Sequence, residues 1–496
     1  MNNTVLRKIT MLQLVLVLCS ICYGQEKTAT DQGIIELGKK HRFYSKVLNE
    51  EREIWVRVPT GYNVDKASKY SVVYLLDGPN NFIYTAGLLR QLEIRSVPKS
   101  ILVGIANTNR SRDLTPAIME EGKVKSNSTM GGADNFMKMI ENDLFPFIAQ
   151  NYSINGFRTL VGHSYGGLFA IHSLATKPEM FNAYLAISPS LWWNDQKVVS
   201  YFEERLKANP DMKGLLYLTI ANERGKMLGG LLKLVGVLES EAPKNLRWDY
   251  KVHPNEHHGS IPVVGTMEGF HFFYKDWHMT DLLKEQDKFG LRAFEWRAEK
   301  IKNEFDQEWV LDYDMLSDFL YRLNEEKRFQ EQLETALYLI ETGKKEVEFY
   351  EAVARSHIGL KNRAEAIRYY KEAYKLNPGY PPVVRMLDSL NVNKTTLYTL
   401  PATTKAELKK YIGKYSDGEN VQSIAIVKDS LSITIKDHYI KTTGKLVFMG
   451  DDTFYSTLDD FYFTVKFHFD KKEDKSPSFM TFRYVNGWTR KLGRSK

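Results

Sequence analysis

Residues 162–167 read GHSYGG, and this stretch lies between the apolar run RTLV at residues 158–161 and the run LFAIHSL at residues 168–174. The first run is typical of a buried strand and the second of a helix. A G-x-S-x-G sequence between a strand and a helix predicts a sharp turn, because glycines allow the close backbone approach that pushes the serine hydroxyl out of the sheet. The sequence therefore predicts Ser164 as a nucleophile.

A base is expected downstream of this serine, because a serine hydroxyl is a weak nucleophile at neutral pH. In this chain order a carboxylate comes before the histidine. Three histidines, His253, His257 and His258, lie at the end of a strand-like run at residues 248–253 or in the polar loop after it. We expect His258 to be the base, with His257 and then His253 as the alternatives.

The predicted acid is Glu223, which follows the apolar run at residues 215–220. Open α/β sheets present functional groups at the carboxyl ends of their strands, and Glu223 stands at such an end. Asp195 is the competing candidate. Glu223 would have no catalytic part if it formed a surface ion pair with Arg224 or Lys226.

Two N–H groups are needed to stabilise an oxyanion, and one is expected from Tyr165, directly after the nucleophile. The second is expected from the loop after the strand-like run at residues 72–76, which continues DGPNNF. Pro79 in this loop has no N–H group. We therefore predict Gly78 as the second donor, with the two asparagines after Pro79 as alternatives.

Candidate substrate contacts follow from residue type. Trp192 and Trp193 come after the next predicted strand and suit a pocket wall, since ligand pockets are mostly apolar; core packing is the alternative. Arg112, and with it Arg110, suits an anionic substrate group. A structural ion pair between Arg112 and the adjacent Asp113 is the alternative.

Five motifs in order resemble the esterases related to enterochelin (enterobactin) esterase: YLLDG at 74–78, VGIANTNRSRDLTP at 103–116, GHSYGG at 162–167, SPSLWW at 188–193 and HGS at 258–260. The resemblance covers residues 34–280. It implies an α/β-hydrolase fold with a doubly wound, mostly parallel sheet, and serine esterase activity on carboxylic esters. By position it supports the nucleophile, base and acid named above. The chain departs from the pattern at Pro79 and at Ala221, where relatives often have glycine.

Local sequence pattern also predicts individual strands and helices of the α/β part. Alternating runs at residues 43–48 and 53–58 predict an antiparallel hairpin with its turn at residues 49–52. Residues 135–150 carry apolar side chains at helical spacing and predict one amphipathic helix. Strands that alternate with helices predict a mostly parallel sheet covered on both faces.

Length and charge bound the remaining possibilities. At 496 residues and 43% hydrophobic content the chain is long enough for several domains. We expect a leader at 1–24, a hydrolase domain at 25–284, a helical domain at 285–399 and a β-rich domain at 400–496. The formal net charge of +7 comes from 68 basic and 61 acidic residues that are interspersed, so no nucleic-acid partner is expected.

The N-terminus reads as a signal peptide, with two basic residues before an apolar stretch at residues 11–21. The stretch is short for a membrane span, so we expect an exported protein, periplasmic or secreted. Both cysteines, Cys19 and Cys22, fall in this leader. The mature chain would then have no disulfides, and neither a metal nor another cofactor is expected, because zinc-binding and P-loop motifs are lacking.

The predicted helical domain carries one recognisable tetratricopeptide-like repeat of 34 residues, marked by Tyr350, Val353, Ala354, Ala366, Tyr370, Ala373 and Pro378. The stretch before it is a degenerate copy. Since about three repeats are needed for an independent solenoid, we expect a spacer that packs on its neighbours. A protein partner bound through this segment is the alternative.

The last predicted domain consists of alternating runs at residues 423–427, 432–435, 461–467 and 479–482. Such runs predict a small antiparallel β domain. Residues 408–415 are similar to the start of lipocalin-like appendages on other exported hydrolases, and barrel closure would remove the sheet edges.

The sequence thus predicts an exported serine esterase that works through an acyl-enzyme, on a small-molecule siderophore ester or an acylated carbohydrate. Two alternatives stay open. One is an acyltransferase on the same fold. The other is a non-catalytic binding or assembly protein that uses its helical and β modules.

Overall fold

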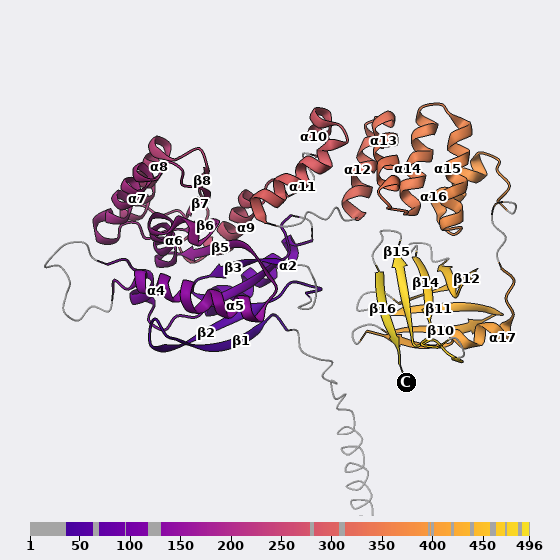
Figure 1. Cartoon of the computed structure of the whole chain (residues 1–496), viewed down its shortest axis with the longest axis horizontal. Coiled ribbons are helices and arrows are strands. Elements are labelled where there is room, and N and C mark those ends of the chain that lie inside the picture. The colour runs from indigo at the N-terminus through magenta and orange to yellow at the C-terminus, as the bar shows by residue number, and fades with distance from the viewer. Residues whose placement is uncertain are drawn as a thin grey trace, which may run out of the picture.

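The computed structural model describes residues 36–62, 69–94, 96–117, 130–277, 282–306, 313–394, 397, 401–417, 421–436, 441–456, 463–471, 474–484 and 489–495. Figure 1 shows an α/β part, a helical unit and a small β part along the chain. The predicted leader, with both cysteines, lies outside the described residues. In the part of the chain that is described, no helix combines the length and the apolar character needed to cross a membrane.

The α/β part is built on an eight-stranded sheet of order β1-β2-β4-β3-β5-β6-β7-β8. Its strands are β1 (Lys39–Ser45), β2 (Glu50–Arg57), β3 (Tyr70–Leu75), β4 (Ser100–Ile105), β5 (Ile154–His163), β6 (Ala183–Ile187), β7 (Gly214–Ile220) and β8 (Leu246–Val252). β1 pairs with β2, and β2 with β4, in antiparallel fashion, and the remaining neighbours are parallel. The predicted mostly parallel sheet is confirmed.

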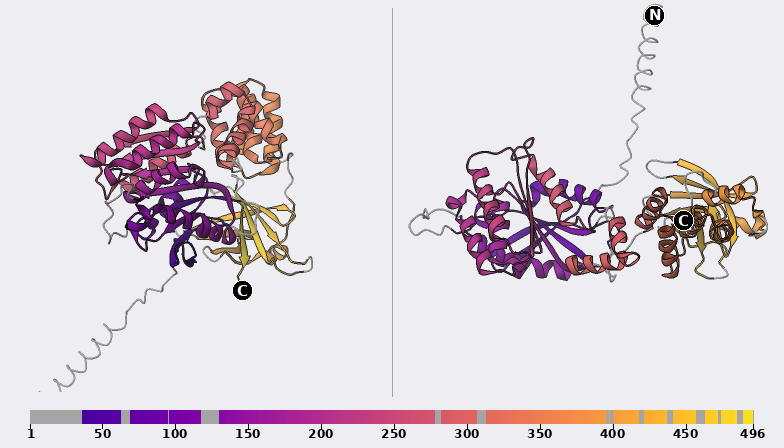
Figure 2. Two further views of the ribbon diagram at one scale, coloured as in Figure 1. Left: turned by 60° about the vertical axis from the view of Figure 1, so that its left-hand side comes forward. Right: turned by 90° about the horizontal axis from the view of Figure 1, so that it is seen from above.

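Helices cover both faces of this sheet (Figures 1 and 2). One face packs against α4 (Ala133–Met139), α5 (Phe145–Asn151), α6 (Tyr165–Thr176), α7 (Lys197–Ala208) and α8 (Lys226–Glu241). The other packs against α2 (Gly78–Leu92), α9 (Ile261–Phe273) and α11 (Arg292–Phe305). Every residue of β3 and β4 is buried, because alternate side chains enter cores on opposite faces.

Two local expectations need correction. The entry hairpin turns at residues 46–49 rather than 49–52, since Asn49 takes the left-handed conformation (φ 54°) that asparagine tolerates. The helix expected at 135–150 is α4 and α5 joined by a π-helical turn, Ile140–Leu144. Pro146, in the first turn of α5, lacks the N–H group that would continue the regular pattern.

The helical unit contains α10 (Leu282–Phe289), α12 (Tyr313–Glu325), α13 (Phe329–Glu341), α14 (Val347–Gly359), α15 (Arg363–Leu376) and α16 (Pro381–Ser389). From α12 to α16, each helix packs on the next. Five successive packed helices fit the repeat interpretation, which stays a prediction. The Phe305 ring of α11 lies 5.2 Å from Phe157 and 5.1 Å from Tyr274, so the predicted boundary at residue 285 is no break in packing.

The C-terminal part is a closed antiparallel barrel of order β10-β11-β12-β13-β14-β15-β16-β9. A short helix α17 (Lys405–Leu408) precedes β9 (Gly413–Ser416), and the other strands are β10 (Val421–Val427), β11 (Ser430–Lys436), β12 (Lys441–Gly450), β13 (Thr453–Ser456), β14 (Phe463–His468), β15 (Phe479–Tyr484) and β16 (Thr489–Arg494). Aromatic side chains fill its interior, among them Tyr411, Tyr415 and Phe454. Arg483 of β15 donates to Glu346 at 2.6 Å and so ties the barrel to the helical unit.

Candidate active site

Ser164 forms the sharp turn between β5 and α6, with φ 61° and ψ −115°. This conformation is costly for a residue other than glycine and persists only where the surroundings enforce it. The glycines make room for the turn. A Cβ on Gly162 would lie 2.2 Å from the Gly166 carbonyl oxygen, and one on Gly167 would lie 2.9 Å from Pro189 Cα. GHSYGG therefore folds as the predicted strand-to-helix elbow.

The backbone of Ser164 is held from the neighbouring strand end. Its N–H donates to the Ile187 carbonyl at 2.9 Å, and its carbonyl accepts from the Ser190 N–H at 3.1 Å. The Ser164 Oγ lies 3.3 Å from Ser190 Oγ. Ser190 was not predicted as a site residue, although it stands in the SPSLWW motif. Its contact with Ser164 joins the loops after two different strands, and a local sequence pattern does not reveal such a contact.

His258 and Glu223 meet at this elbow. His258 Nδ1 lies 2.7 Å from Glu223 Oε1, and the Glu223 side chain is only 14% exposed. The His258 ring packs on the ring of His163 with centroids 4.4 Å apart. His163 directly precedes Ser164 in the chain, so His258 contacts the elbow at the residue before the candidate nucleophile. The structure thus pairs the predicted base with the predicted acid, and stacks the base on the residue that precedes the predicted nucleophile.

The alternative residues have other surroundings. His257 Nδ1 accepts from the Gly259 N–H at 3.1 Å, and His253 Nε2 lies 3.0 Å from Glu268. Asp195 is exposed, in a left-handed turn with φ 48°. Glu223 directs Oε1 to His258 rather than to Arg224 or Lys226.

Backbone hydrogen bonds tie the loop after β7 to the loop after β8. Asn222 N–H donates to the Glu256 carbonyl at 2.9 Å, and His253 N–H donates to the Ile220 carbonyl at 2.7 Å. Because these bonds join the two loops just before the residues that carry the carboxylate and the imidazole, they limit the separation of Glu223 and His258.

His163 presents a neutral ring to His258. Burial and, to a smaller extent, the nearby His258 together lower the pKa of His163 to about 4, although Asp77 opposes the shift. The ring is therefore uncharged near neutral pH. A charged His163 would disfavour the imidazolium that His258 forms when it accepts a proton.

The first turn of α2 bears on the second oxyanion donor. The N–H groups of Asn80 and Asn81 donate to the Asp77 carbonyl at 3.0 and 3.2 Å, which occupies both asparagine alternatives. Pro79 has no N–H group. Gly78 is the first residue of α2, and the first N–H groups of a helix have no acceptor within the helix. The Gly78 N–H group therefore stays the predicted second donor. A Cβ on Gly78 would lie 2.7 Å from the Gly104 carbonyl carbon, so only glycine fits there.

A polar cluster centred on the buried Asp77 carboxylate joins this loop to the elbow. The Asp77 carboxylate accepts from Arg110 Nε at 2.6 Å, from Arg110 Nη2 at 2.9 Å and from Asn107 Nδ2 at 2.5 Å. Arg110 Nη2 also lies 3.3 Å from the His163 carbonyl oxygen. A substrate contact was predicted for Arg110, and Asp77 and Asn107 were not identified as site residues, although they stand in the first two motifs.

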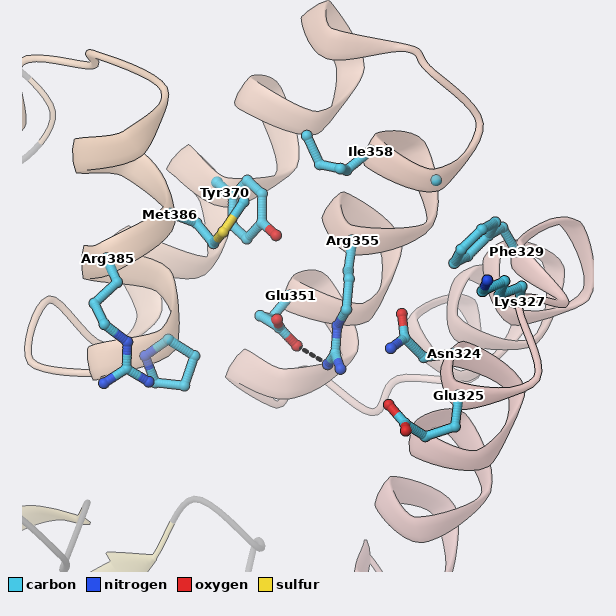
Figure 3. A pocket seen from close by; sticks show the side chains of 12 residues that line it. Asn324, Glu325, Lys327, Phe329, Glu351, Arg355, Ile358, Tyr370, Arg385 and Met386 are labelled. Carbon is cyan, nitrogen blue, oxygen red and sulfur yellow. Dashed lines mark hydrogen bonds and ion pairs between the residues drawn. The ribbon is translucent and has the colours of Figure 1, made fainter.

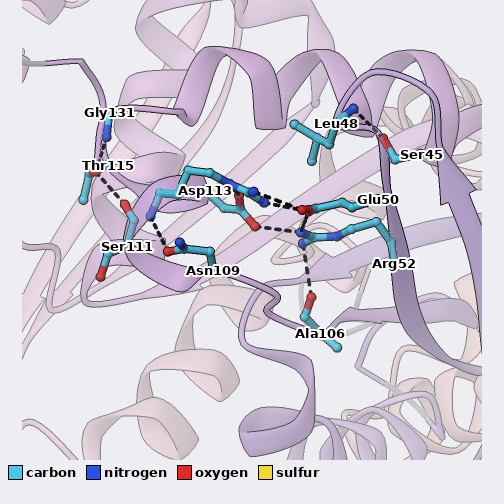
Figure 4. A network of polar contacts seen from close by, with 11 residues as sticks. Ser45, Leu48, Glu50, Arg52, Ala106, Asn109, Ser111, Asp113, Thr115 and Gly131 are labelled. Carbon is cyan, nitrogen blue, oxygen red and sulfur yellow. Dashed lines mark hydrogen bonds and ion pairs between the residues drawn. The ribbon is translucent and has the colours of Figure 1, made fainter. Parts of the chain in front are cut away.

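Arg112 belongs to a structural network with Glu50 and Asp113, two residues that Figure 4 labels. Its Nε donates to Asp113 at 2.7 Å, and Nη1 and Nη2 donate to Glu50 at 3.0 and 2.6 Å. The Arg112 guanidinium holds the pKa of Glu50 below its ordinary value. All three guanidinium nitrogens are engaged within the protein, so Arg112 has the structural ion pair with Asp113 that was the alternative to a substrate contact.

Trp192 and Trp193 lie beside the residue that follows the nucleophile. Their ring centroids are 6.2 and 6.0 Å from that of Tyr165, and both side chains are half-buried. They form an apolar wall next to the elbow that is partly open to solvent. Within the described ranges, no group of three or more His, Cys, Asp or Glu side chains is arranged to hold a metal ion.

A mostly parallel sheet with a serine elbow and a His–carboxylate pair after later strands is the arrangement of α/β-hydrolase-type enzymes. The family model described as "Putative esterase" matches residues 45–223. A solved IroE-like serine hydrolase from Shewanella oneidensis is 30% identical, with a TM-score of 0.50, over 66% of this chain and 99% of that one. The chain belongs to the esterase family related to enterochelin esterase.

Curated relatives match over shorter stretches. The siderophore enterobactin esterase of Emericella nidulans is 38% identical over 26% of this chain and 49% of that protein. The ferri-bacillibactin esterase BesA of Bacillus subtilis is 33% identical over 29% of this chain and 56% of that protein. The chain therefore spans about half the length of these curated relatives.

Proposed function

We propose that this protein is a serine esterase that cleaves carboxylic esters through an acyl-enzyme. The observation that carries the proposal is the 2.7 Å contact between Glu223 and His258 beside the strained Ser164 elbow. Ser164 Oγ attacks the ester carbonyl and His258 takes its proton. His258 then protonates the leaving alcohol, and water releases the acyl group by the same steps. Glu223 orients the imidazole and stabilises its charged form.

The oxyanion of the tetrahedral intermediate would be bound by the N–H groups of Tyr165 and Gly78. These two N–H groups lie at the N-termini of α6 and α2, where the helix dipoles also favour negative charge. The cluster of Asp77, Asn107 and Arg110 supports this proposal, because it links the loop of Gly78 to the backbone carbonyl before Ser164.

We propose a siderophore ester as the substrate, on the strength of relatives whose names state that activity. Trp192 and Trp193, beside Tyr165, suit an aromatic acyl or alcohol group. We further propose that residues 1–24 direct export, so that hydrolysis takes place outside the cytoplasm.

The test is hydrolysis of p-nitrophenyl butyrate and of enterobactin by the chain from residue 25 onward, with Ser164→Ala and a control, Ser240→Ala. Ser240 is exposed on α8, where its hydroxyl bonds the Gly236 carbonyl. We expect turnover by the wild type and the control, and loss in Ser164→Ala. Equal turnover by Ser164→Ala would refute the mechanism. Hydrolysis of p-nitrophenyl butyrate but not of enterobactin would refute the siderophore ester as substrate and would leave the serine mechanism standing.

A further inference from the structure

The eight-stranded sheet has two open edges, formed by β1 and β8. Within the described residues, no further strand pairs with the outer side of either one. Figure 1 shows β8 at the opposite end of the sheet from β1, with α8 beside it. An open edge presents unused N–H and C=O groups to a strand of another chain, and proteins usually protect such an edge.

The β1 edge is protected by charge of one sign. It carries Lys39, Lys40 and Arg42 and has no acidic residue. Two β1 strands that paired with each other would bring these cations together, and like charges opposite each other destabilise a strand pair. β1 is therefore a poor template for a second copy of the chain.

The backbone of β8 offers unused groups at every second residue. The His253 N–H, just after β8, donates to the Ile220 carbonyl of β7 at 2.7 Å, and the register of β8 on β7 is unbroken. Backbone groups alternate in direction along a strand, so the odd-numbered residues of β8 bond to β7. The N–H and C=O groups of Trp248, Tyr250 and Val252 therefore face the open edge.

The charges of β8 alternate in sign along one face, in the order Arg247, Asp249 and Lys251. In an antiparallel pair of two β8 strands with Tyr250 opposite Tyr250, each Asp249 lies opposite the Lys251 of the other copy. Opposite charges stabilise such a pair. Lys251 bonds Glu268 of its own chain at 2.6 Å, but its side chain is half-exposed and an ammonium group has three donors.

The same register brings apolar side chains together on the other face of β8. Val252 is 42% exposed, and in this register it lies opposite Trp248 of the second copy. Trp248 and Tyr250 are half-buried and pack on the core beneath α7 and α8. Pairing of the two strands would therefore cover apolar surface as well as the open backbone groups.

α8 adds apolar surface along this edge. Near the end of α8, Glu241 lies 3.8 Å from Lys207 of α7, so that side of α8 faces α7. Leu232 comes nine residues earlier, about two and a half turns, and therefore lies on the opposite side of α8, toward the open edge. Leu232 is 47% exposed. Two copies that met at β8 would bring their α8 helices and these leucines near each other.

The cavity of the helical unit, which Figure 3 shows, has no such match. It has a volume of about 670 Å³, and both cations and carboxylates line it, among them Arg355, Glu351 and Glu325. Arg355 Nη2 already bonds Glu351. The charges of this cavity therefore favour no occupant of one sign, whereas the β8 edge is complementary to a second copy of itself.

We propose that this protein forms a two-fold dimer in which the β8 strands of two copies pair in antiparallel fashion and join the two sheets into one. Tyr250 lies at the two-fold axis. Asp249 of each chain pairs with Lys251 of the other, and Val252 of each chain packs on Trp248 of the other. The same patch serves both chains, so the interface is closed and does not propagate into a filament.

The single chain has a way to keep this edge satisfied. The Asp249 carboxylate accepts from the Tyr250 N–H at 2.7 Å, so this outward donor has a partner before the second copy arrives. In the dimer, a carbonyl of the other β8 replaces the carboxylate, which then pairs with Lys251. The interface does not include Ser164, and the proposal is independent of the esterase reaction.

The test is sedimentation velocity of the chain from residue 25 onward, at concentrations across the micromolar range. Asp249→Lys and Lys251→Glu each place like charges opposite each other when two identical copies pair. An equimolar mixture of the two variants restores opposite charges at both positions. Both side chains are exposed, so folding should be kept, and circular dichroism checks it. Lys39→Glu, an exposed change on the β1 edge, is the matched control.

We expect the wild type and Lys39→Glu to reach twice the mass of the chain. Each β8 variant alone should have a dissociation constant at least about tenfold higher, and the mixture should dimerise again. The proposal is overturned if Asp249→Lys and Lys251→Glu dimerise as the wild type does, or if their mixture stays monomeric. A wild type that is monomeric throughout the range would also overturn it, in favour of a strand of a different protein at this edge.

Discussion

Strained backbone positions gather around the candidate active site. Asp77, Ser164 and Ser188 have positive φ angles of 54°, 61° and 39°, and each follows the carboxyl end of a parallel strand. Such conformations cost about 1–3 kcal/mol each and are enriched at functional sites. The packing of the sheet and its helices holds these residues in the positions that the proposed chemistry requires.

Glu223→Gln tests the proposed role of the acid. Glutamine keeps the shape of the side chain, but its amide can hold His258 in the wrong tautomer. We expect kcat for p-nitrophenyl butyrate to fall by about 10³–10⁴-fold with little change in KM. Glu239→Gln, an exposed change on α8, is the control. A wild-type kcat in Glu223→Gln would show that the carboxylate is not needed.

His163 makes stability depend on pH. Its pKa is about 4 in the folded chain and 6.5 ordinarily, so the unfolded chain binds more protons between these values. The free energy of unfolding contributed by His163 is therefore present above pH 6.5 and is lost as the pH falls toward 4. In urea titrations across this range, His163→Asn should decline less steeply than the wild type. Equal slopes would contradict the buried, neutral imidazole.

At the scale of elements, the contribution of an ion pair to the free energy of unfolding depends on its burial. Arg57 of β2 and Glu93 at the end of α2 are 7% and 5% exposed, and two bonds of 2.7 and 2.8 Å join them. Glu93 also accepts from the Ser100 N–H at the start of β4. One carboxylate thus connects three elements of the α/β part.

Arg57→Met should lower the free energy of unfolding by about 3–5 kcal/mol, because it leaves the buried Glu93 charge without its cation. Arg42→Met is the matched control. Arg42 pairs with Glu53 but is 76% exposed, and such pairs contribute about 0–1 kcal/mol. Both values come from chemical denaturation at neutral pH. Similar losses in the two variants would contradict the assigned difference in burial.

Glu348 gives the helical unit the opposite pH dependence to that of His163. Its pKa is raised from 4.5 to about 9, so its contribution to stability is present below pH 4.5 and is lost as the pH rises toward 9. The glutamine of Glu348→Gln cannot ionise, so the stability of this variant should decline less steeply as the pH rises. The unfolding midpoint, followed by circular dichroism between pH 5 and 9, is the measurement. An unchanged pH profile in the variant would place Glu348 in a solvated setting.

Much of the architecture could be predicted because its signals are local. The elbow, the apolar strands of the sheet and the expected runs of the barrel each show their period within a few residues. The turn before β2 and the π-helical turn before α5 could not be predicted, because they depend on how the folded structure accommodates Asn49 and Pro146. β12 is harder to see, because small and charged residues dilute its alternation.

The residues of the candidate site likewise fall into those that the sequence could predict and those that it could not. Ser164, Glu223 and His258 follow from chain order and strand ends, which the sequence displays. The cluster of Asp77, Asn107 and Arg110 does not, because residues about 30 positions apart meet only when β3 and β4 lie side by side. Local charge pattern likewise does not show whether Arg112 faces a substrate or Glu50.

At the scale of the whole molecule, α11 unites the α/β part with the helical unit. Phe305 packs on Phe157 and Tyr274, and Asn155 Nδ2 donates to the carbonyl of Asp306 at 3.2 Å. The same hydrophobic core continues into α12, α13 and α14. The esterase part therefore extends past the boundary that composition suggests.

This continuity predicts where the chain can be shortened. A fragment of residues 25–306 should keep the fold and the kcat/KM of the α/β part, with some loss of thermal stability because Phe294 of α11 loses its contact with Phe319 of α12. A fragment of residues 25–277 should unfold at a lower temperature, because it exposes Phe157 and Tyr274. Calorimetry and ester hydrolysis measure both. Equal stability of the two fragments would show that α11 is not part of this core.

The most direct measurement is labelling of the chain from residue 25 onward with a fluorophosphonate, followed by intact-mass spectrometry and peptide mapping. The wild type is predicted to gain one phosphonyl group on Ser164, and Ser164→Ala is predicted to gain none while Ser240→Ala is labelled normally. A wild type that stays unlabelled, or an equal mass gain in Ser164→Ala, would contradict the assignment of Ser164 as the nucleophile of the proposed ester hydrolysis.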